Sequence, residues 1–386
     1  MGGFEKLRVG VAGMGVRGGL FASVVEQNSA AQLAALADPE PAALGRAERR
    51  FGVPGYAEYR EMLDKTTLDA LVIATPDFAH KDPFLAAAAK GISVFVENPF
   101  ATDLSEALEM YGAVKRNGIK CRVAFEGRWN GVFVNMLEQA RNRAMTGEIL
   151  AINATLNSTI HVPTRMLSWA NKSSPAFFLL THVADLACYA KGRPIKSVYA
   201  TGVKKLLKSM GFDTYDSIMT HIVFDDGAHA SFENSWIAPE SMPAVFQCDF
   251  RILGEKQAYM ANFNDQILKI AGAGTSTRVG AATGAGAPAG ADTAAGADIA
   301  VGAGTAAWAN TAAADTAAGR YEHVCAGTQA IDGRLLSPPA LMLHSFIDDV
   351  INGRAIYSNE EDGLLSARLL DAVRRSLESG AVVEMG

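Results

Sequence analysis

Cysteine is scarce and scattered in this chain. Four occur among 386 residues, at Cys121, Cys188, Cys248 and Cys325, and no two form a C-x-x-C pair. This spacing fits neither a disulfide framework nor the paired thiolates of a structural zinc site, so we expect no bound metal. Unpaired thiols are typical of a reducing compartment, and we therefore expect a cytoplasmic protein.

An excess of basic charge and long apolar runs are also lacking. The chain has 35 Lys and Arg against 41 Asp and Glu, a formal charge of −6, with no basic stripe. We therefore expect no nucleic-acid partner. The N-terminal segment breaks its apolar residues with glycines and has no secretory-leader pattern. A membrane helix needs roughly 18 charge-poor apolar residues, and we expect no membrane association.

One stretch is apolar only by count. Ala271 to Gly319 holds 21 Ala and 10 Gly in 49 residues, with Thr and Asp interspersed and few large side chains. Such a segment cannot bury enough surface to offset its chain entropy. We therefore expect residues 271–319 to form a flexible Ala/Gly-rich insertion.

Strand-like and helix-like segments alternate over the first 120 residues. Helical patterns such as Pro41–Phe51 separate five apolar runs, which lie at Leu7–Ala12, Ala31–Ala37, Leu68–Ala74, Ile92–Val96 and Lys120–Phe125. Alternation with short connections predicts a parallel sheet covered by helices. We thus predict an α/β fold whose N-terminal domain, residues 1–126, is a doubly wound Rossmann sheet.

After residue 126 the pattern changes. One helix is followed by several strand-like segments with few helices between them, and Asp225-Asp226-Gly227 is a hairpin turn signal. Consecutive strands predict an α+β domain with a large, mostly antiparallel open sheet. We assign it residues 127–386, with the insertion inside it and C-terminal helices at 339–351 and 360–377.

A glycine-rich motif follows the first strand. Gly13, Met14, Gly15, Val16, Arg17 and Gly18 form G-x-G-x-x-G, which opens a helix, and Asp38 ends the second strand 20 residues later. The glycines permit a tight turn and close approach of the backbone to a pyrophosphate, and the acid accepts hydrogen bonds from the ribose hydroxyls. The motif favours NAD, while Arg17 and Arg46 leave NADP open. The alternative is an ordinary glycine turn with a solvated acid.

These residues resemble the glucose–fructose oxidoreductase, inositol dehydrogenase and rhizopine catabolism (Gfo/Idh/MocA) family. The likeness rests on Gly13 to Gly18, Asp38, Thr75-Pro76 with His80, Glu97-Asn98-Pro99 and His182-Val183-Ala184-Asp185. It implies a Rossmann domain joined to an open-sheet domain, with substrate between them. It also implies oxidation or reduction of a secondary alcohol of a sugar, inositol or related ring by a homodimer or homotetramer. The resemblance places Thr75, Pro76, His80, Glu97 and Asn98 beside the cofactor.

Two positions depart from the family pattern. Asn98 stands where the family usually has lysine, and an amide can orient a hydroxyl but cannot carry charge or a proton. Alignment on His182 places Phe178 where the family often has aspartate. We therefore expect His182 to be the catalytic base, with Asn98 orienting the substrate and Asp185, at i+3, orienting the imidazole. A core histidine bonded to backbone, a surface Asp185 and a structural Glu97 are the open alternatives, and Pro99 permits a cis bond.

Substrate contacts are expected from two regions. One follows the run Lys120–Phe125 and matches where the family places substrate-facing residues, so the resemblance implies that Arg128 can hold an anion and Asn130 a hydroxyl, with Trp129 between them. The other precedes His182 and offers His161, Arg165 and Lys172. For Arg128 a domain-interface ion pair is an equal alternative.

Three functions remain open from the sequence. The first is an NAD(P)-dependent dehydrogenase for a sugar-like or cyclic hydroxy compound. The second is a lyase, hydrolase or epimerase of the same fold that recycles bound NAD. The third is an NAD-binding regulator without catalysis, which the replacements at Asn98 and Phe178 would suit.

Overall fold

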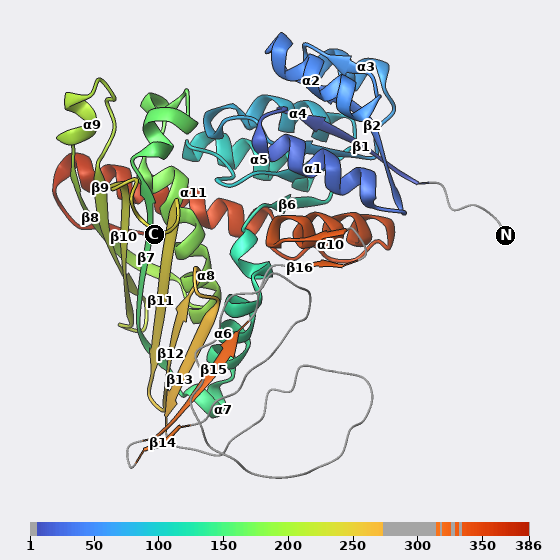
Figure 1. Ribbon diagram of the computed structural model, residues 1–386. Helices are drawn as coiled ribbons and strands as arrows, with labels where there is room; N and C mark the ends of the chain where they lie inside the picture. The colour runs from blue at the N-terminus through green and yellow to red at the C-terminus, as the bar shows by residue number, and fades with distance from the viewer. Residues whose placement is uncertain (1–5, 273–313, 317–318, 326–328, 332–333, 386) are drawn as a thin grey trace, which may run out of the picture.

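The computed structural model describes residues 6–272, 314–316, 319–325, 329–331 and 334–385. Two sheets organise the chain, one for each predicted domain (Figure 1). Within these residues, no helix is long and apolar enough to cross a membrane.

The first sheet is parallel throughout and has the order β3-β2-β1-β4-β5-β6. Its strands are β1 (Leu7–Ala12), β2 (Ala31–Ala37), β3 (Gly55–Tyr56), β4 (Ala70–Ile73), β5 (Ser93–Val96) and β6 (Cys121–Val123). The order reverses between β1 and β4, and the carboxyl ends of strands at such a point form the usual ligand site of open α/β sheets. The predicted doubly wound sheet is confirmed.

Five helices connect these strands: α1 (Val16–Gln27), α2 (Pro41–Phe51), α3 (Tyr59–Lys65), α4 (Lys81–Ala89) and α5 (Leu104–Asn117). Local signals set their ends. In α5, for example, the Asp103 carboxylate caps the first amides, and Gly118 ends the helix in the left-handed conformation, with φ of 62°. The central strands are buried on both faces, which explains their continuous apolar runs.

The second sheet has the order β14-β15-β13-β12-β11-β7-β10-β9-β8-β18. All its strand pairs are antiparallel except β7 with β10. Its longer strands are β7 (Ile149–Thr159), β8 (Ile195–Val203), β9 (Ser217–Phe224), β10 (His229–Ala238), β11 (Phe246–Gly254), β12 (Gln257–Asn262), β13 (Ile267–Gly272) and β15 (Gly319–Cys325). Short strands at its edges are β14 (Ala314–Thr316) and β18 (Val383–Glu384). The predicted mostly antiparallel sheet is confirmed.

Helices cover one face of this sheet. They are α6 (Gly131–Arg141), the short α7 (Arg143–Thr146) and α8 (Thr181–Lys191), while α9 (Leu206–Ser209) lies in the β8–β9 connection. The core beneath α6 and α8 is apolar, with Phe133, Leu180 and Phe232 all buried. Before α8 the chain makes two π-helical turns, Val162–Met166 and Ala176–Leu180, and the second leads directly into α8 at Thr181.

The predicted insertion 271–319 is too wide at both ends. Ala271 and Gly272 belong to β13 and pair with Ala258 and Gln257 of β12, and β13 also pairs with β15, which begins at Gly319. Backbone hydrogen bonds form a ladder whatever the size of the side chain, so small residues do not exclude a strand. Strand β14, at 314–316, also lies within the predicted insertion. Residues 273–313, the bulk of the predicted insertion, lie outside the described residues.

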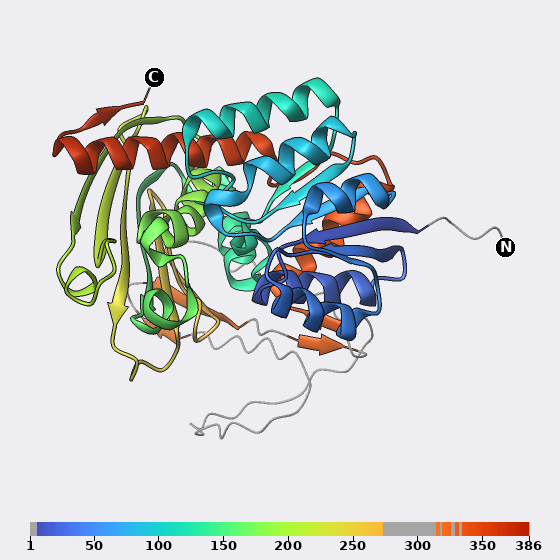
Figure 2. The same ribbon diagram turned by 90° about the horizontal axis from the view of Figure 1, so that it is seen from above.

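The two C-terminal helices are α10 (Pro338–Ile351) and α11 (Glu360–Ser379), each within two residues of its predicted limits. A division at residue 126 puts both in the second domain, yet α10 lies on the first sheet. Its Leu343 and Phe346 pack into the core formed by α1 and β1. Helix α11 runs from the first domain along the second sheet (Figure 2).

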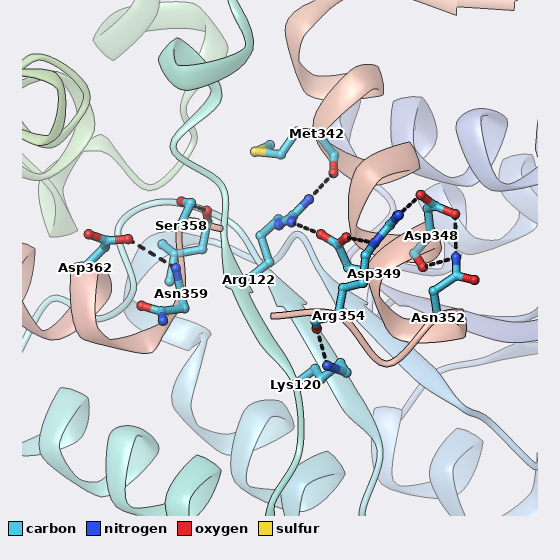
Figure 3. A network of polar contacts seen from close by, with 11 residues as sticks. Lys120, Arg122, Met342, Asp348, Asp349, Asn352, Arg354, Ser358, Asn359 and Asp362 are labelled. Carbon is cyan, nitrogen blue, oxygen red and sulfur yellow. Dashed lines mark hydrogen bonds and ion pairs between the residues drawn. The ribbon is translucent and has the colours of Figure 1, made fainter. Parts of the chain in front are cut away.

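A buried arginine fastens α10 to β6 (Figure 3). The Arg122 side chain is fully buried, and its guanidinium donates to the Met342 carbonyl at 2.8 Å and to Asp349 Oδ2 at 2.7 Å. Arg354 donates to the other oxygen of Asp349 at 3.0 Å. Burial lowers the pKa of Arg122 to about 10, while Asp349 favours its charged form. Helix α10 is therefore tied to the strand that leads into the second domain.

Candidate active site

Each glycine in the loop between β1 and α1 has a different structural reason for lacking a side chain. Gly13 has φ of 89°, and a Cβ there would lie 2.6 Å from the Ala74 carbonyl oxygen. A Cβ on Gly18 would lie 1.7 Å from the Gly13 oxygen, so α1 meets the loop too closely for any side chain. Gly15 has open space around it, because a Cβ there would have no atom within 4 Å beyond its chain neighbours. That opening at the start of α1 fits a phosphate group approaching the backbone.

The other residues of this loop divide between core and surface. Met14 is buried, and its backbone N–H donates to Asp38 Oδ2 at 2.5 Å, while the Glu40 N–H donates to Asp38 Oδ1 at 2.8 Å. Asp38 is therefore held beside the loop at the end of β2, where a ribose-binding carboxylate is expected. Val16 is 87% exposed. Arg46 is exposed on α2.

The loop after β4 is tied to the loop after β5 through His80. The imidazole is buried, with Nδ1 2.8 Å from the Pro99 carbonyl and Nε2 3.1 Å from the Thr75 carbonyl. The Thr75 hydroxyl donates to the Ala79 carbonyl across Pro76, and the Asn98–Pro99 peptide is cis. Because both ring nitrogens face backbone carbonyls, His80 shapes these loops and offers no nitrogen to a ligand.

Four charged or titratable side chains gather at the carboxyl ends of β5 and β6. Arg17, in the first turn of α1, donates through Nε to Glu97 Oε1 at 2.5 Å and through Nη2 to Glu126 Oε2 at 2.9 Å. His182, in the first turn of α8, interacts electrostatically with both carboxylates and with Arg17. The cluster combines the glycine-rich loop, two adjacent strand ends and the second domain.

Burial keeps the His182 imidazole neutral, the form that can act as a base. It lowers the pKa of the imidazole below its ordinary value, although Glu126 and Glu97 act in the opposite direction. The ring is therefore neutral at neutral pH and can accept a proton. A core histidine with its nitrogens bonded to backbone, the alternative from the sequence, describes His80 instead.

Asn98 meets the residue that precedes this histidine. Its Nδ2 donates to Thr181 Oγ1 at 2.8 Å, a contact from the first domain to the second. Its Oδ1 is buried and, among the residues that the structure describes, has no hydrogen-bond partner. A buried amide oxygen without a donor is costly unless a ligand supplies one, which a substrate hydroxyl can do.

Asp185 does not orient His182, contrary to the expectation from its i+3 position. Its two oxygens accept from Arg128 Nη2 at 2.5 Å and Nε at 2.8 Å, and Arg128 also bonds Asp362 of α11. A buried bidentate ion pair with Arg128 is stronger than the contact with His182 that the i+3 spacing would allow, so Asp185 points to the arginine. Burial raises the pKa of Asp185 to about 6, and Arg128 opposes this rise.

The expected substrate contacts after β6 are structural instead. Arg128 has a side chain 3% exposed and forms a buried ion pair with Asp185 of α8, in line with the ion-pair alternative rather than a substrate contact. Trp129 packs against Tyr357 at 5.2 Å between ring centroids and stacks on Arg122. Asn130 caps α6 by accepting from the Val132 and Phe133 amides. Arg128 and Asn130 are buried with their polar groups bonded to protein partners, and the Trp129 ring is packed between Tyr357 and Arg122, so we withdraw all three residues as substrate ligands.

The second expected region lies between β7 and α8. Lys172 places its ammonium 4.7 Å from the Phe78 ring centroid, and Ser173 donates to Asp77, so this segment docks on the loop after β4. Arg165 is mostly exposed and pairs with Glu240 at 3.6 Å. His161 is half-buried at the start of the first π-helical turn. Lys172 thus contacts the first domain, whereas Arg165 is engaged elsewhere in the second.

Glu126 was not among the residues expected to act in the site. Its position three residues after β6, next to β5, which Glu97 follows directly, was the available signal, because parallel strands end at one edge of their sheet. Nothing in the sequence indicated that Arg17 would reach both carboxylates.

Comparison with known proteins gives the fold and the family. Residues 7–125 match the family model described as "Oxidoreductase family, NAD-binding Rossmann fold", and residues 135–260 match the "GFO/IDH/MocA C-terminal domain". The structure of levoglucosan dehydrogenase in complex with NADH and levoglucosan superposes with a TM-score of 0.77 at 22% identity, covering 98% of this chain and 99% of that one. This likeness extends over both domains.

Curated relatives match over part of their length. Scyllo-inositol 2-dehydrogenase (NAD(+)) of Bacillus subtilis is 28% identical over 61% of this chain and 69% of its own. Levoglucosan dehydrogenase of Pseudarthrobacter phenanthrenivorans is 31% identical over 51% of this chain and 57% of its own. A 2,7-anhydro-N-acetylneuraminate hydratase of Escherichia coli is 25% identical over 59% and 61%. The two family models together match most of the chain, which therefore belongs to the Gfo/Idh/MocA family of oxidoreductases with an NAD-binding Rossmann fold.

Proposed function

We propose that this protein is an NAD-dependent dehydrogenase that oxidises a secondary alcohol of a sugar, inositol or related cyclic polyol, or reduces the matching ketone. The observation that carries the proposal is the placement of a neutral His182 beside the strand ends that adjoin the glycine-rich loop. A dehydrogenase needs a dinucleotide site and one group that handles a proton, and this junction supplies both.

The residues present fit NAD. The open space at Gly15, the amides at the start of α1 and the carboxylate of Asp38 suit the pyrophosphate and the adenosine ribose. A free 2′-hydroxyl suits Asp38 better than a 2′-phosphate, which its charge would repel, so NADP is the weaker candidate. Bound NAD supplies the hydride acceptor.

His182 and Asn98 divide the work on the alcohol. The imidazole of His182 accepts the hydroxyl proton as the carbonyl forms and returns it in the reverse reaction. The buried Oδ1 of Asn98 accepts a hydrogen bond from a neighbouring hydroxyl, which orients a polyol, while Nδ2 stays on Thr181. Lys172 and His161 are further candidates for hydroxyl contacts from the segment before α8.

A cyclic polyol is the substrate class that we propose because the relatives include inositol and levoglucosan dehydrogenases. We also propose a cytoplasmic homodimer or homotetramer. Three of the four cysteines, Cys121, Cys188 and Cys248, are free thiols, as suits a reducing compartment. Met219 and Tyr199 on the second sheet are 47% and 40% exposed, as suits a subunit contact.

The test is a panel of inositols, monosaccharides and anhydrosugars monitored by NADH absorbance, with calorimetry to establish NAD binding. Formation of NADH from at least one cyclic polyol is expected. NAD binding with no turnover across the panel would contradict the dehydrogenase.

An NAD-recycling reaction is the second candidate, favoured by Asn98 in place of lysine and by the likeness to a hydratase. A product identified by mass spectrometry without net NADH would establish it. A regulator without catalysis would form neither NADH nor a converted product, and it would bind a protein partner in an NAD-dependent way.

A further inference from the structure

We infer that Glu126 is the anionic partner of His182 in proton transfer and that Arg17 holds its carboxylate in place. The inference rests on the proposed dehydrogenase function and names the group that supports its base. Glu126 is a positioning residue here, because it acts on the substrate only through the imidazole.

The backbone brings Glu126 to His182 through a continuous contact between two segments. The short helix Glu126–Trp129 packs against α8. A Cβ on Gly127 would lie 3.1 Å from Leu186 Cδ1, and Arg128 forms its ion pair with Asp185. The residues that follow Glu126 therefore pack against the turn that follows His182, which places Glu126 and His182 at the start of the same contact between the two segments.

The charges around the imidazole leave Glu126 available. Within the part of the chain that the structure describes, Arg17, Glu97 and Glu126 interact electrostatically with His182, and the single guanidinium is shared by the two carboxylates. The cluster therefore retains a net negative charge when His182 is neutral. Asp185, the acid on the same helix as His182, is bonded to Arg128. Phe178, one turn before His182, carries no charge and packs among Trp169, Trp236 and Phe246.

The reaction makes this charge useful. When the alcohol is oxidised, its O–H bond breaks and the proton goes to a ring nitrogen of His182. The carbon–hydrogen bond breaks with its electron pair passing to NAD⁺, and the carbonyl double bond forms. A positive charge appears on a partly buried ring, and a fixed carboxylate stabilises it without reorganisation.

Arg17 keeps that carboxylate ionised. Burial acts to raise the pKa of Glu126, but Arg17 and His182 outweigh it, so the pKa lies below its ordinary value. Burial lowers the pKa of His182, and Glu126 is the largest opposing influence, ahead of Glu97. Without Glu126 the imidazole would be a weaker base.

The experiment compares Glu126→Gln, which removes the charge at nearly constant shape, with Glu126→Asp, which keeps it. Glu61→Gln is the matched control, because Glu61 pairs with Lys65 on exposed α3, away from the site. For Glu126→Gln we expect kcat to fall about tenfold or more and the acid limb of kcat/KM to move to lower pH. Glu126→Asp should recover part of the rate, and NAD affinity should stay within about twofold.

The imidazole can also be titrated by NMR in histidine-labelled protein, with the His182→Gln variant assigning its signal. Glu126→Gln should lower the His182 midpoint, and Glu61→Gln should leave it unchanged. This readout needs no turnover, so it tests the inference even where no polyol is oxidised and the proposed function fails. An unchanged midpoint in folded Glu126→Gln protein, or a lost rate with an unmoved pH profile, would overturn the inference.

Discussion

Replacing Arg128 by methionine should destabilise the protein strongly at neutral pH and weakly in acid. The Arg128 and Asp185 side chains are 3% and 4% exposed, and Asp362, the second partner, is 30% exposed. Removing one member of a buried pair leaves an uncompensated charge and costs about 3–5 kcal/mol of unfolding free energy. Most of that cost should come from Asp185.

The pH dependence has a definite sign. Burial raises the pKa of Asp185 from the ordinary 3.8 to about 6, so its ionisation opposes folding increasingly as pH rises through that interval. Arg128 limits the rise, and without it the pKa lies higher still. The penalty of Arg128→Met should therefore be full at neutral pH and much smaller near about pH 5, where the carboxyl in the variant is protonated.

Urea unfolding at the two pH values measures this difference. Arg193→Met is the matched control, because Arg193 also pairs bidentately with an aspartate, Asp225, but is 48% exposed. We expect the control to lose less than about 1 kcal/mol. The double variant Arg128→Met with Asp185→Leu should recover much of the stability, because apolar groups replace the buried pair.

Two results would refute this reasoning. One is an Arg128→Met loss no larger than that of Arg193→Met, and the other is a large loss that does not change with pH. Unchanged stability combined with a raised KM would instead restore the substrate contact first expected for Arg128.

Four further predictions concern the cofactor site and the base. Gly15→Ala should leave the melting temperature unchanged and weaken NAD binding, whereas Gly18→Ala should cost about 1–3 kcal/mol in unfolding, because its Cβ would lie 1.7 Å from a carbonyl oxygen. Asp38→Ala should raise the Kd of NAD about tenfold by calorimetry, and an unchanged Kd would remove the assigned ribose contact. His182→Gln should lower kcat at least about 100-fold. In the native enzyme kcat/KM should fall with acidification at a midpoint below about 6.5, since burial lowers the pKa of His182 and the base must be neutral.

The fold could be predicted from the sequence where local patterns determine the structure. The helix Pro41–Phe51 and the strand Ala31–Ala37 occur with the predicted limits, because proline and glycine bound the helix and the strand is continuously apolar. Strand β13 was missed because its last residues are alanine and glycine, and backbone pairing rather than side-chain pattern holds them. Helix α10 was placed within the second domain by its position in the chain but packs on the first sheet, since amphipathicity shows that a face is buried but not against what.

The site could be predicted from the sequence only where a motif specifies the backbone geometry. The glycines of the first loop have the predicted roles because positive φ and close packing leave no other residue. Polar side chains were harder, because the partner of a long side chain depends on distant segments. Arg17 contacts a residue 109 positions away, and Arg128 contacts one 234 positions away. No local spacing rule predicts such pairs.

Two arginines at the domain junction bind different carboxylates. The carboxylates that Arg128 binds contribute to stability, and those that Arg17 binds act on the catalytic base. Arg128 matches Asp185 bidentately in a nearly dry contact, which satisfies that acid and leaves it little influence on His182. Arg17 is shared between Glu97 and Glu126 and is 35% exposed, so neither acid is neutralised completely. The helix Glu126–Trp129 contributes to both arrangements within three residues. A change in its register would therefore disturb the buried Arg128–Asp185 pair and the surroundings of the base together.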